Sequence, residues 1–395
     1  MYESVEGPQS QLIMERDNLI RSYFSLGLHY SEILSLLLIQ HNIILSERQL
    51  KRILRRLNLT RRKNFSSFEE IFLFIEELLE GSGRFHGYRW IHLKCLQRGL
   101  VVKQETVRLL LKILDPTGVS TRRRRRLRRR DYFNKGPNYL WHMDGYDKLK
   151  PYGIAISGCI DGFSRYIIWL QASYTNNNPR IISGYYISAV ESCGGCPRSV
   201  RSDLGTENRH VEQMQIFLRN NLESDDSLPP FIYGSSTHNQ RIEAWWGILR
   251  KHNAQFWMDI FEDLKNEGKF SGTILDKALV QYCFLHLVQG QLDQVVQEWN
   301  SHKISSRNRR SPVGKPIIMY YTPEMYYARD YIVKSPEDAI LSCREESLFP
   351  LVHCDQDVYE LCQILSEENH YERPSTAYEA TDLYIQLRND ILSML

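Results

Sequence analysis

Three acidic residues stand where a fold can bring their carboxylates together. Asp144 lies in a largely apolar stretch, Asp203 follows another, and Glu243 lies in the first turn of an amphipathic segment. Neighbouring carboxylates repel each other unless cations neutralise them, and Mg²⁺ or Mn²⁺ prefers such oxygen ligands. Two such ions, about 3.5–4 Å apart, activate an attacking hydroxyl and stabilise the leaving oxygen of a phosphodiester. A lone glutamate on a helix is usually a solvated surface residue, so the hypothesis depends on the fold.

The sequence around these acids predicts an α/β layer. Three strands in a meander, followed by alternating strands and helices, are typical of a sheet with helices on its faces. Asp144 then lies in the first strand, Asp203 at the exit of the fourth, and Glu243 near the start of the helix after the fifth. Strand ends and helix starts form the usual ligand crevice of such folds. The expected strands cover residues 139–149, 153–164, 165–173, 198–203 and 230–236, and the expected helices cover 179–192, 207–221 and the segment after 239.

Other acids nearby have simpler interpretations. Asp161 lies in "CIDGFSR", where we expect a structural role in a turn. Asp147 is three residues after Asp144, an odd offset that directs it to the other side of a strand. Glu207, four residues after Asp203, is expected to cap or begin a helix. Asp144 and Asp203 are therefore the favoured candidates.

The segment that carries Glu243 also suits nucleic acid. Gly247, Arg250 and Lys251 follow at helical spacing and share the face of Glu243, where cations contact phosphates. Trp245, Ile248 and Leu249 are expected to face the core. For Trp246 we favour core packing over base stacking. A polar loop before the helix is suited to positioning DNA, although Asn239 can also act as a simple helix cap; its residues are His238, Asn239 and Gln240.

The motifs resemble those of a known family. "WHMDGYDKL", "CIDGFSRYI", "VRSDLGTEN" and "HNQRIEAWWGILR" are similar, in order and context, to the catalytic core of retroviral-type integrases and DDE transposases, including the transposon-derived integrase-core proteins of eukaryotic genomes. The resemblance implies a ribonuclease H-like fold. It further implies that Asp144, Asp203 and Glu243 form a catalytic triad holding two Mg²⁺ (or Mn²⁺) ions for DNA strand transfer. The 39 residues between Asp203 and Glu243 include a polar insertion, "ESDDSLPP", that accounts for a longer spacing than is common in the family.

Charge divides the chain into a basic front and an acidic tail. Residues 1–140 carry 26 Lys+Arg against 14 Asp+Glu, whereas residues 312–395 carry 6 against 15. A basic front is typical of a region that meets polyanions. Two short predicted helices, over 30–42 and 46–59, fit a helix-turn-helix, with Ser46 and Gln49 forming a capping box. The alternative is a helical hairpin with a basic solvated face. The residues expected to bind DNA here are Lys51, Arg52 and Arg55.

A run of arginines follows a second predicted helical module. Such a block cannot pack in a core, and it suits either a DNA-binding linker or a nuclear localisation signal. Its members are Arg122, Arg123, Arg124, Arg125, Arg126, Arg128, Arg129 and Arg130. The predicted organisation is a helix-turn-helix-like region (1–64), a second helical module (65–120), the arginine-rich linker (121–135), the integrase catalytic core (136–320) and an acidic helical region (321–395).

Several classes are disfavoured by the sequence. The apolar run Ile33–Ile39 is too short to span a bilayer, and the first residues lack a secretory signal. We therefore expect no membrane association, and a nuclear location in a eukaryote or otherwise a cytoplasmic one. Cys193 and Cys196 lack a second pair of ligands at zinc-finger spacing, so the eight cysteines are interpreted as reduced and structural.

The leading hypothesis is a metal-dependent integrase or transposase that acts on DNA as a homo-oligomer. Two alternatives stay open: a host-retained DNA-binding or regulatory protein on an integrase scaffold, and a metal-dependent nuclease of the same fold. The front lacks the paired His and Cys ligands of a retroviral integrase, and the tail lacks its basic β-rich character. Both departures put a retroviral mode of assembly in doubt and leave the core prediction intact.

Overall fold

The computed structural model describes residues 8–123, 133–219, 228–234, 239–304 and 312–394. They form two compact units, each of which is treated by itself below. One unit contains Met1–Phe133 and Gln297–Ala328, and the other contains Asn134–Val296 and Arg329–Leu395.

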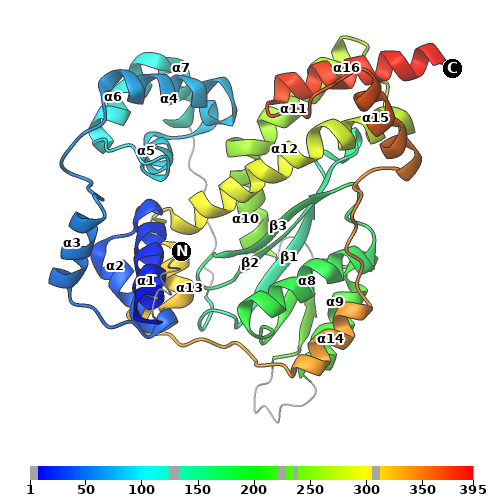
Figure 1. The fold of residues 1–395 in the computed structure, drawn as a ribbon. Helices are drawn as coiled ribbons and strands as arrows, with labels where there is room; N and C mark the ends of the chain where they lie inside the picture. The colour runs from blue at the N-terminus through cyan, green and yellow to red at the C-terminus, as the bar shows by residue number, and fades with distance from the viewer. Residues whose placement is uncertain (1–7, 124–132, 220–227, 235–238, 305–311, 395) are drawn as a thin grey trace, which may run out of the picture. The chain divides into compact units, whose positions relative to one another are not determined.

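The second unit is built on a five-stranded mixed sheet, as the sequence predicts (Figure 1). The strand order is β3-β2-β1-β4-β5; β1, β2 and β3 pair antiparallel, whereas β4 runs parallel to β1 and β5 runs parallel to β4. This arrangement is that of a ribonuclease H-like core. The strands are β1 (Trp141–Tyr146), β2 (Ala155–Asp161), β3 (Ile167–Ser173), β4 (Val200–Ser202) and β5 (Phe231–Tyr233).

Alternation along β1 assigns its residues to two faces of the sheet. Trp141 and Met143 pack in a hydrophobic cluster with Tyr186 and Met214 from helices α8 and α9. The intervening residues, including Asp144, therefore face the other side, where helix α10 contacts β1 and β2. The two-residue period thus places Asp144 away from the main hydrophobic cluster and beneath the helix that carries Glu243.

Helices cover both faces of this sheet (Figure 1). The helix α10 continues through a short π-helical turn, η5 (Arg250–Ala254), into α11. Helices α11 and α12 pack together through edge-on aromatic rings, such as Phe261 against Phe284. The helices on the β1-cluster face are α8 (Pro179–Cys193), α9 (Arg209–Arg219) and α14 (Glu337–Glu345), and those beyond the other face are α10 (Gln240–Leu249), α11 (Gln255–Asn266) and α12 (Ile274–Ser301).

The acidic tail is helical, as predicted, and it packs onto the sheet unit. Cys343 of α14 joins the hydrophobic cluster beneath β1, and Val333 pairs with Cys196 through two backbone hydrogen bonds. The last helix is anchored to α12, because Arg388 Nε and the Tyr384 hydroxyl both donate to Asp276 Oδ1. The remaining tail helices are α15 (Gln356–Glu368) and α16 (Ala377–Met394).

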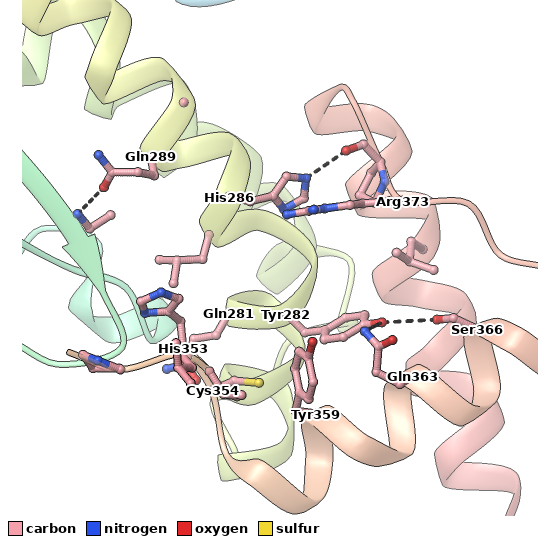
Figure 2. A pocket seen from close by; sticks show the side chains of 18 of the residues that line it. Gln281, Tyr282, His286, Gln289, His353, Cys354, Tyr359, Gln363, Ser366 and Arg373 are labelled. Carbon is pink, nitrogen blue, oxygen red and sulfur yellow. Dashed lines mark hydrogen bonds between the residues drawn. The ribbon is translucent and has the colours of Figure 1, made fainter.

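A cavity of mixed polar and apolar lining lies between the tail, helix α12 and strand β3. Its volume is ≈1100 Å³, and Tyr282, His286, His353 and Tyr359 are among its lining residues (Figure 2). None of the three predicted catalytic acids lines it. At one wall, the Gln289 side chain accepts from Ala172 N (2.7 Å) and donates to Leu170 O (3.2 Å), so its amide pairs with the outer edge of β3.

The first unit consists of two small helical groups. In one, α1, α2, α3 and α13 share a core that contains Ile20, Leu36, Leu50 and Ile318. Helix α1 was not expected from the sequence. The capping box of Ser46 and Gln49 at the start of α3 is confirmed. These helices are α1 (Pro8–Ser25), α2 (Tyr30–His41), α3 (Glu47–Arg56) and α13 (Pro316–Tyr321).

The second helical group surrounds Ile75, Ile91 and Val107. Residues 121–123 of the predicted arginine-rich linker are the last residues of α7, and residues 124–132 lie outside the described ranges. The helices are α4 (Phe68–Glu80), α5 (Tyr88–Gln97), α6 (Gln104–Leu114) and α7 (Pro116–Arg123). Among the described residues, short 3₁₀ turns are η1 (Ser82–Phe85), η2 (Lys150–Tyr152), η3 (Thr206–Asn208) and η6 (Pro323–Tyr326). No helix in the described ranges is long and apolar enough to cross a membrane.

Candidate active site

Asp144 lies in the middle of the sheet, on the central strand. Its Oδ2 accepts a hydrogen bond of 2.8 Å from the indole Nε1–H of Trp246 on α10. Burial raises the pKa of Asp144 to about 7; the Trp246 hydrogen bond opposes the rise, and the charges of Asp203 and Glu243 add to it. The charges of Asp144, Asp203 and Glu243 therefore act on one another, as expected if the fold brings the three carboxylates together.

Asp203 directly follows β4, the parallel neighbour of β1. The buried amide of Asn208 donates to Asp203 Oδ1 at 3.1 Å and to Glu207 Oε1 at the same distance. A Cβ at Gly205 would lie 1.8 Å from Glu207 Oε1, so only glycine lets the Glu207 side chain fold back here. Glu207 lies in the 3₁₀ turn before α9 and is a fourth acid beside Asp203, where the sequence suggested only a helix start.

Glu243 occupies the first turn of α10 and is exposed. Burial of the carboxyl group and the charge of Asp203 raise the pKa of Glu243. The helix buries Trp245, Trp246 and Leu249 and leaves Gly247 on its exposed side. The expected division of α10 into a core face and an open face is confirmed at these positions, and core packing of Trp246 is confirmed over base stacking.

The start of α10 is tied to β1 by a buried polar pair. His142 Nδ1 and Asn239 Oδ1 are 2.7 Å apart, and Asn239 Nδ2 donates to Met143 O at 2.9 Å. Burial lowers the pKa of His142 to about 3, so the ring is neutral near pH 7. Asn239 makes no side-chain cap, and the alternative that it caps α10 is therefore wrong. His142 was missed, although its place two residues before Asp144 puts both side chains on one face.

The neighbouring acids have separate roles. Asp161 is buried and accepts from Asn138 N, Phe163 N and Ser164, which confirms its predicted structural turn. Asp147 lies just beyond β1 and bonds to Asn176 Nδ2 and Lys150 Nζ. Neither residue contributes to the electrostatic cluster around Asp144.

A family model of the integrase core domain matches residues 132–320. This segment is an integrase core domain. The match confirms the resemblance found in the motifs, and it supports an integrase- or transposase-type function within the polynucleotidyl transferase superfamily. Such a domain implies DNA as the partner. No curated protein matches the chain.

The donor chemistry of the integrase core suits a hard divalent cation. Asp144, Asp203 and Glu243 offer carboxylate oxygens, which Mg²⁺ and Mn²⁺ prefer. Their mutual repulsion is the condition that a bound cation relieves. In the parts of the chain that the structure describes, no group of three or more His, Cys, Asp or Glu side chains is arranged to hold a metal ion.

The predicted DNA contacts fall in several places. Arg250 and Lys251 are exposed beyond the end of α10, and Gln240 is half-buried at its start. Asn239 is buried with both ends of its amide engaged on β1, so this geometry gives no support to a contact with DNA. His238 lies outside the described residues.

The basic helix α3 is open to solvent. Lys51, Arg52 and Arg55 are exposed and line a shallow depression together with Glu47 and Arg48. Lys51 Nζ pairs with Glu47 Oε1 at 2.6 Å. Of the predicted arginine block, Arg122 and Arg123 end α7; Arg124, Arg125, Arg126, Arg128, Arg129 and Arg130 lie outside the described residues.

Proposed function

We propose that this integrase core cuts and joins DNA strands, with Asp144, Asp203 and Glu243 as its metal-binding acids. The observation that carries the proposal is the electrostatic coupling of Asp144 to both other acids within an integrase core domain. A structural carboxylate is commonly held by a cationic side chain or, like Asp161, by several backbone N–H groups. The side-chain donor to Asp144 is instead the uncharged indole of Trp246.

The proposed reaction is a hydrolysis followed by a transesterification. Water attacks a phosphodiester at an element end and releases a 3′-hydroxyl, which then attacks a target phosphodiester. Each step forms one P–O bond as another breaks, so no covalent enzyme intermediate or energy source is needed. Two bound Mg²⁺ or Mn²⁺ ions would activate the attacking oxygen and stabilise the leaving one. Asp144, Asp203 and Glu243 would hold such ions through their carboxylate oxygens.

The test replaces each acid by its amide. Glu243→Gln and Asp144→Asn are expected to lower Mg²⁺-dependent strand transfer by roughly 10³-fold or more, because residues of one catalytic unit fail together. The assay uses duplex ends taken from the DNA that flanks the gene, with a supercoiled plasmid as the target. Asp147→Asn is the matched control, because Asp147 is exposed and outside the cluster. Full activity of either triad variant contradicts the assignment.

The same assay separates the two alternatives. Salt-dependent DNA binding without any product, under conditions that stabilise the fold, favours a regulatory DNA-binding protein on an integrase scaffold. Cleavage without joined product favours a nuclease. Terminal inverted repeats in the flanking DNA favour a transposon enzyme, and their absence favours a retained host gene. Joining two ends in one event requires more than one active site, so a homo-oligomer is part of the proposal.

DNA contact by α3 is proposed from its exposed charges. Replacing Lys51, Arg52 and Arg55 by glutamine is expected to flatten the dependence of log binding constant on log salt, by about 0.9 for each phosphate that the protein no longer neutralises. Arg108→Gln serves as the control, since Arg108 on α6 is exposed but paired with Glu105. An unchanged salt slope in the triple variant contradicts the proposal. The arginines of 122–130 are proposed as a further DNA-binding segment or nuclear localisation signal.

A further inference from the structure

Trp246 is the side chain that holds Asp144. Its Nε1–H donates to Asp144 Oδ2 at 2.8 Å, and its ring is buried at 6 % exposure. An indole N–H is a donor only and carries no charge. It can therefore fix the orientation of a carboxylate without neutralising its charge. A lysine or arginine in its place would neutralise the carboxylate and compete with a metal cation for it.

Space for this ring comes from a glycine on the neighbouring strand. Gly158 of β2 is directly opposite Asp144 in the antiparallel register. A Cβ at Gly158 would lie 2.6 Å from Trp246 Cη2 and 3.4 Å from Cζ2. The absence of a side chain at Gly158 thus leaves the space that the Trp246 indole occupies. From this position the indole N–H reaches Asp144.

Two further features connect Trp246 to strand β1 and to Glu243. The ring of Tyr146, on the same face of β1 as Asp144, lies 5.3 Å from the Trp246 ring between centroids. On α10, Trp246 comes three residues after Glu243, within one helical turn. The indole therefore links the strand that carries one acid to the helix that carries another, while Asn239 ties the start of the same helix to β1.

We propose that Trp246, seated on Gly158, is a positioning residue that sets the orientation of Asp144 and its separation from Glu243. This inference rests on the proposed function of the triad. Partners that orient metal-binding side chains commonly change metal affinity or activity by 10- to 100-fold when they are removed. The indole is not itself a ligand or a proton donor in the reaction.

The first test is Trp246→Phe, which keeps an aromatic ring and removes the N–H. We expect kcat for strand transfer to fall about 10- to 100-fold, and the half-saturating Mn²⁺ concentration to rise by a similar factor, with little change in KM for DNA. The matched control is Trp257→Phe. Trp257 is equally buried, but its Nε1 has no hydrogen-bond partner among the described residues, so kcat and the Mn²⁺ requirement should stay at wild-type values.

A second test needs no metal, activity or change at Trp246. In protein labelled with ¹⁵N at its seven indoles, through-bond correlations from the assigned backbone identify the Trp246 resonance. We expect Asp144→Ala to shift that indole proton upfield while the Trp257 resonance stays in place. An unmoved Trp246 resonance overturns the hydrogen bond and with it the proposal, even if the Trp246→Phe protein does not fold.

The steric half is tested by Gly158→Ala, which should displace the ring and reproduce the loss in kcat and Mn²⁺ affinity. Gly290→Ala is its control, because a Cβ there meets nothing within 4 Å. Wild-type kinetics in Trp246→Phe, together with an inactive Asp144→Asn, overturn the positioning role alone. Activity in Asp144→Asn overturns the proposed function instead, so the two failures are distinct.

Discussion

Two aspartates of the sheet unit stand in opposite surroundings. Asp276, at the start of α12, accepts hydrogen bonds from Ser271, Arg388 and Tyr384. Asp144, on the central strand, accepts from the neutral indole of Trp246 and from the backbone N–H of Gly145, and two acids are its charged neighbours. Burial would raise the pKa of either group. At Asp276 the bonds from Ser271 and Arg388 outweigh burial and hold the pKa well below its usual range, whereas at Asp144 the pKa is raised.

We interpret the difference as that between a structural carboxylate and the proposed functional one. Asp276 is compensated inside the folded chain, and its work is to hold α16 against α12. Among the described residues, the charged neighbours of Asp144 are acids, an arrangement that costs stability and is common at functional sites. Four measurements test this contrast.

The largest effect is expected at the compensated site. Asp276→Asn leaves Arg388 without its charged partner, and breaking a buried ion pair from one side typically costs about 3–5 kcal/mol. Chemical denaturation should show this loss in the free energy of unfolding. Asp147→Asn, on an exposed acid, should change it by about 0.5 kcal/mol or less. Equal stability of the two variants would erase the contrast.

The contribution of Asp276 should also depend on pH in one direction. Its folded pKa is depressed, so its stabilisation is present above the unfolded pKa, about 3.9, and is lost as pH falls through the folded value. The difference in unfolding free energy between wild type and Asp276→Asn should therefore shrink below about pH 4, by at most about 1.4 kcal/mol per pH unit. A difference that is constant down to pH 2 would contradict this.

Divalent cations should stabilise the other site. Binding to the folded state alone adds about 2.7 kcal/mol at a concentration of 100 times Kd. Mn²⁺ is therefore expected to raise the Tm of the wild type and of Asp276→Asn, but not of Asp144→Asn. If Mn²⁺ stabilises Asp144→Asn as much as wild type, the ion binds elsewhere.

The smallest expected effect is a gain in stability, opposite in sign to the loss expected for Asp276→Asn. Without metal, Asp144→Asn removes one of three mutually repelling charges and keeps an oxygen that accepts from Trp246. We expect the free energy of unfolding to rise, by on the order of 1 kcal/mol. A loss of stability as large as that of Asp276→Asn would make Asp144 a structural residue like its counterpart.

Sequence reasoning selected the candidate acids, which stay a prediction, and it predicted the fold that carries them. Motif order, strand pattern and helix spacing led to Asp144, Asp203 and Glu243, and the five-stranded mixed sheet is confirmed. What escaped depends on pairing between distant segments. Gly158 is opposite Asp144 only in the register of β1 with β2, and nothing local in "ISGCID" announces an indole above it.

Local preferences misled at one point for the same reason. Asn239 precedes a helix, where asparagine commonly caps, yet its amide is engaged by His142 and Met143 from a strand almost a hundred positions earlier. The hydrogen bonds of Asn239 with His142 and Met143 thus take the place of a local capping bond to the first turn of α10. Helix α1 was missed because its sequence has only weak apolar periodicity, and its burial of Ile20 depends on α2, α3 and α13.

The amide of Gln289 has a consequence for how copies of this chain can associate. Strand β3 is an outer strand of the sheet, and such strands offer free backbone groups to strands of other molecules. Gln289 gives Ala172 an acceptor and Leu170 a donor, as a neighbouring strand would. At this point the sheet is closed to extension by a second molecule. Gln289→Ala should remove both bonds and leave this part of the β3 edge open to a strand from another molecule.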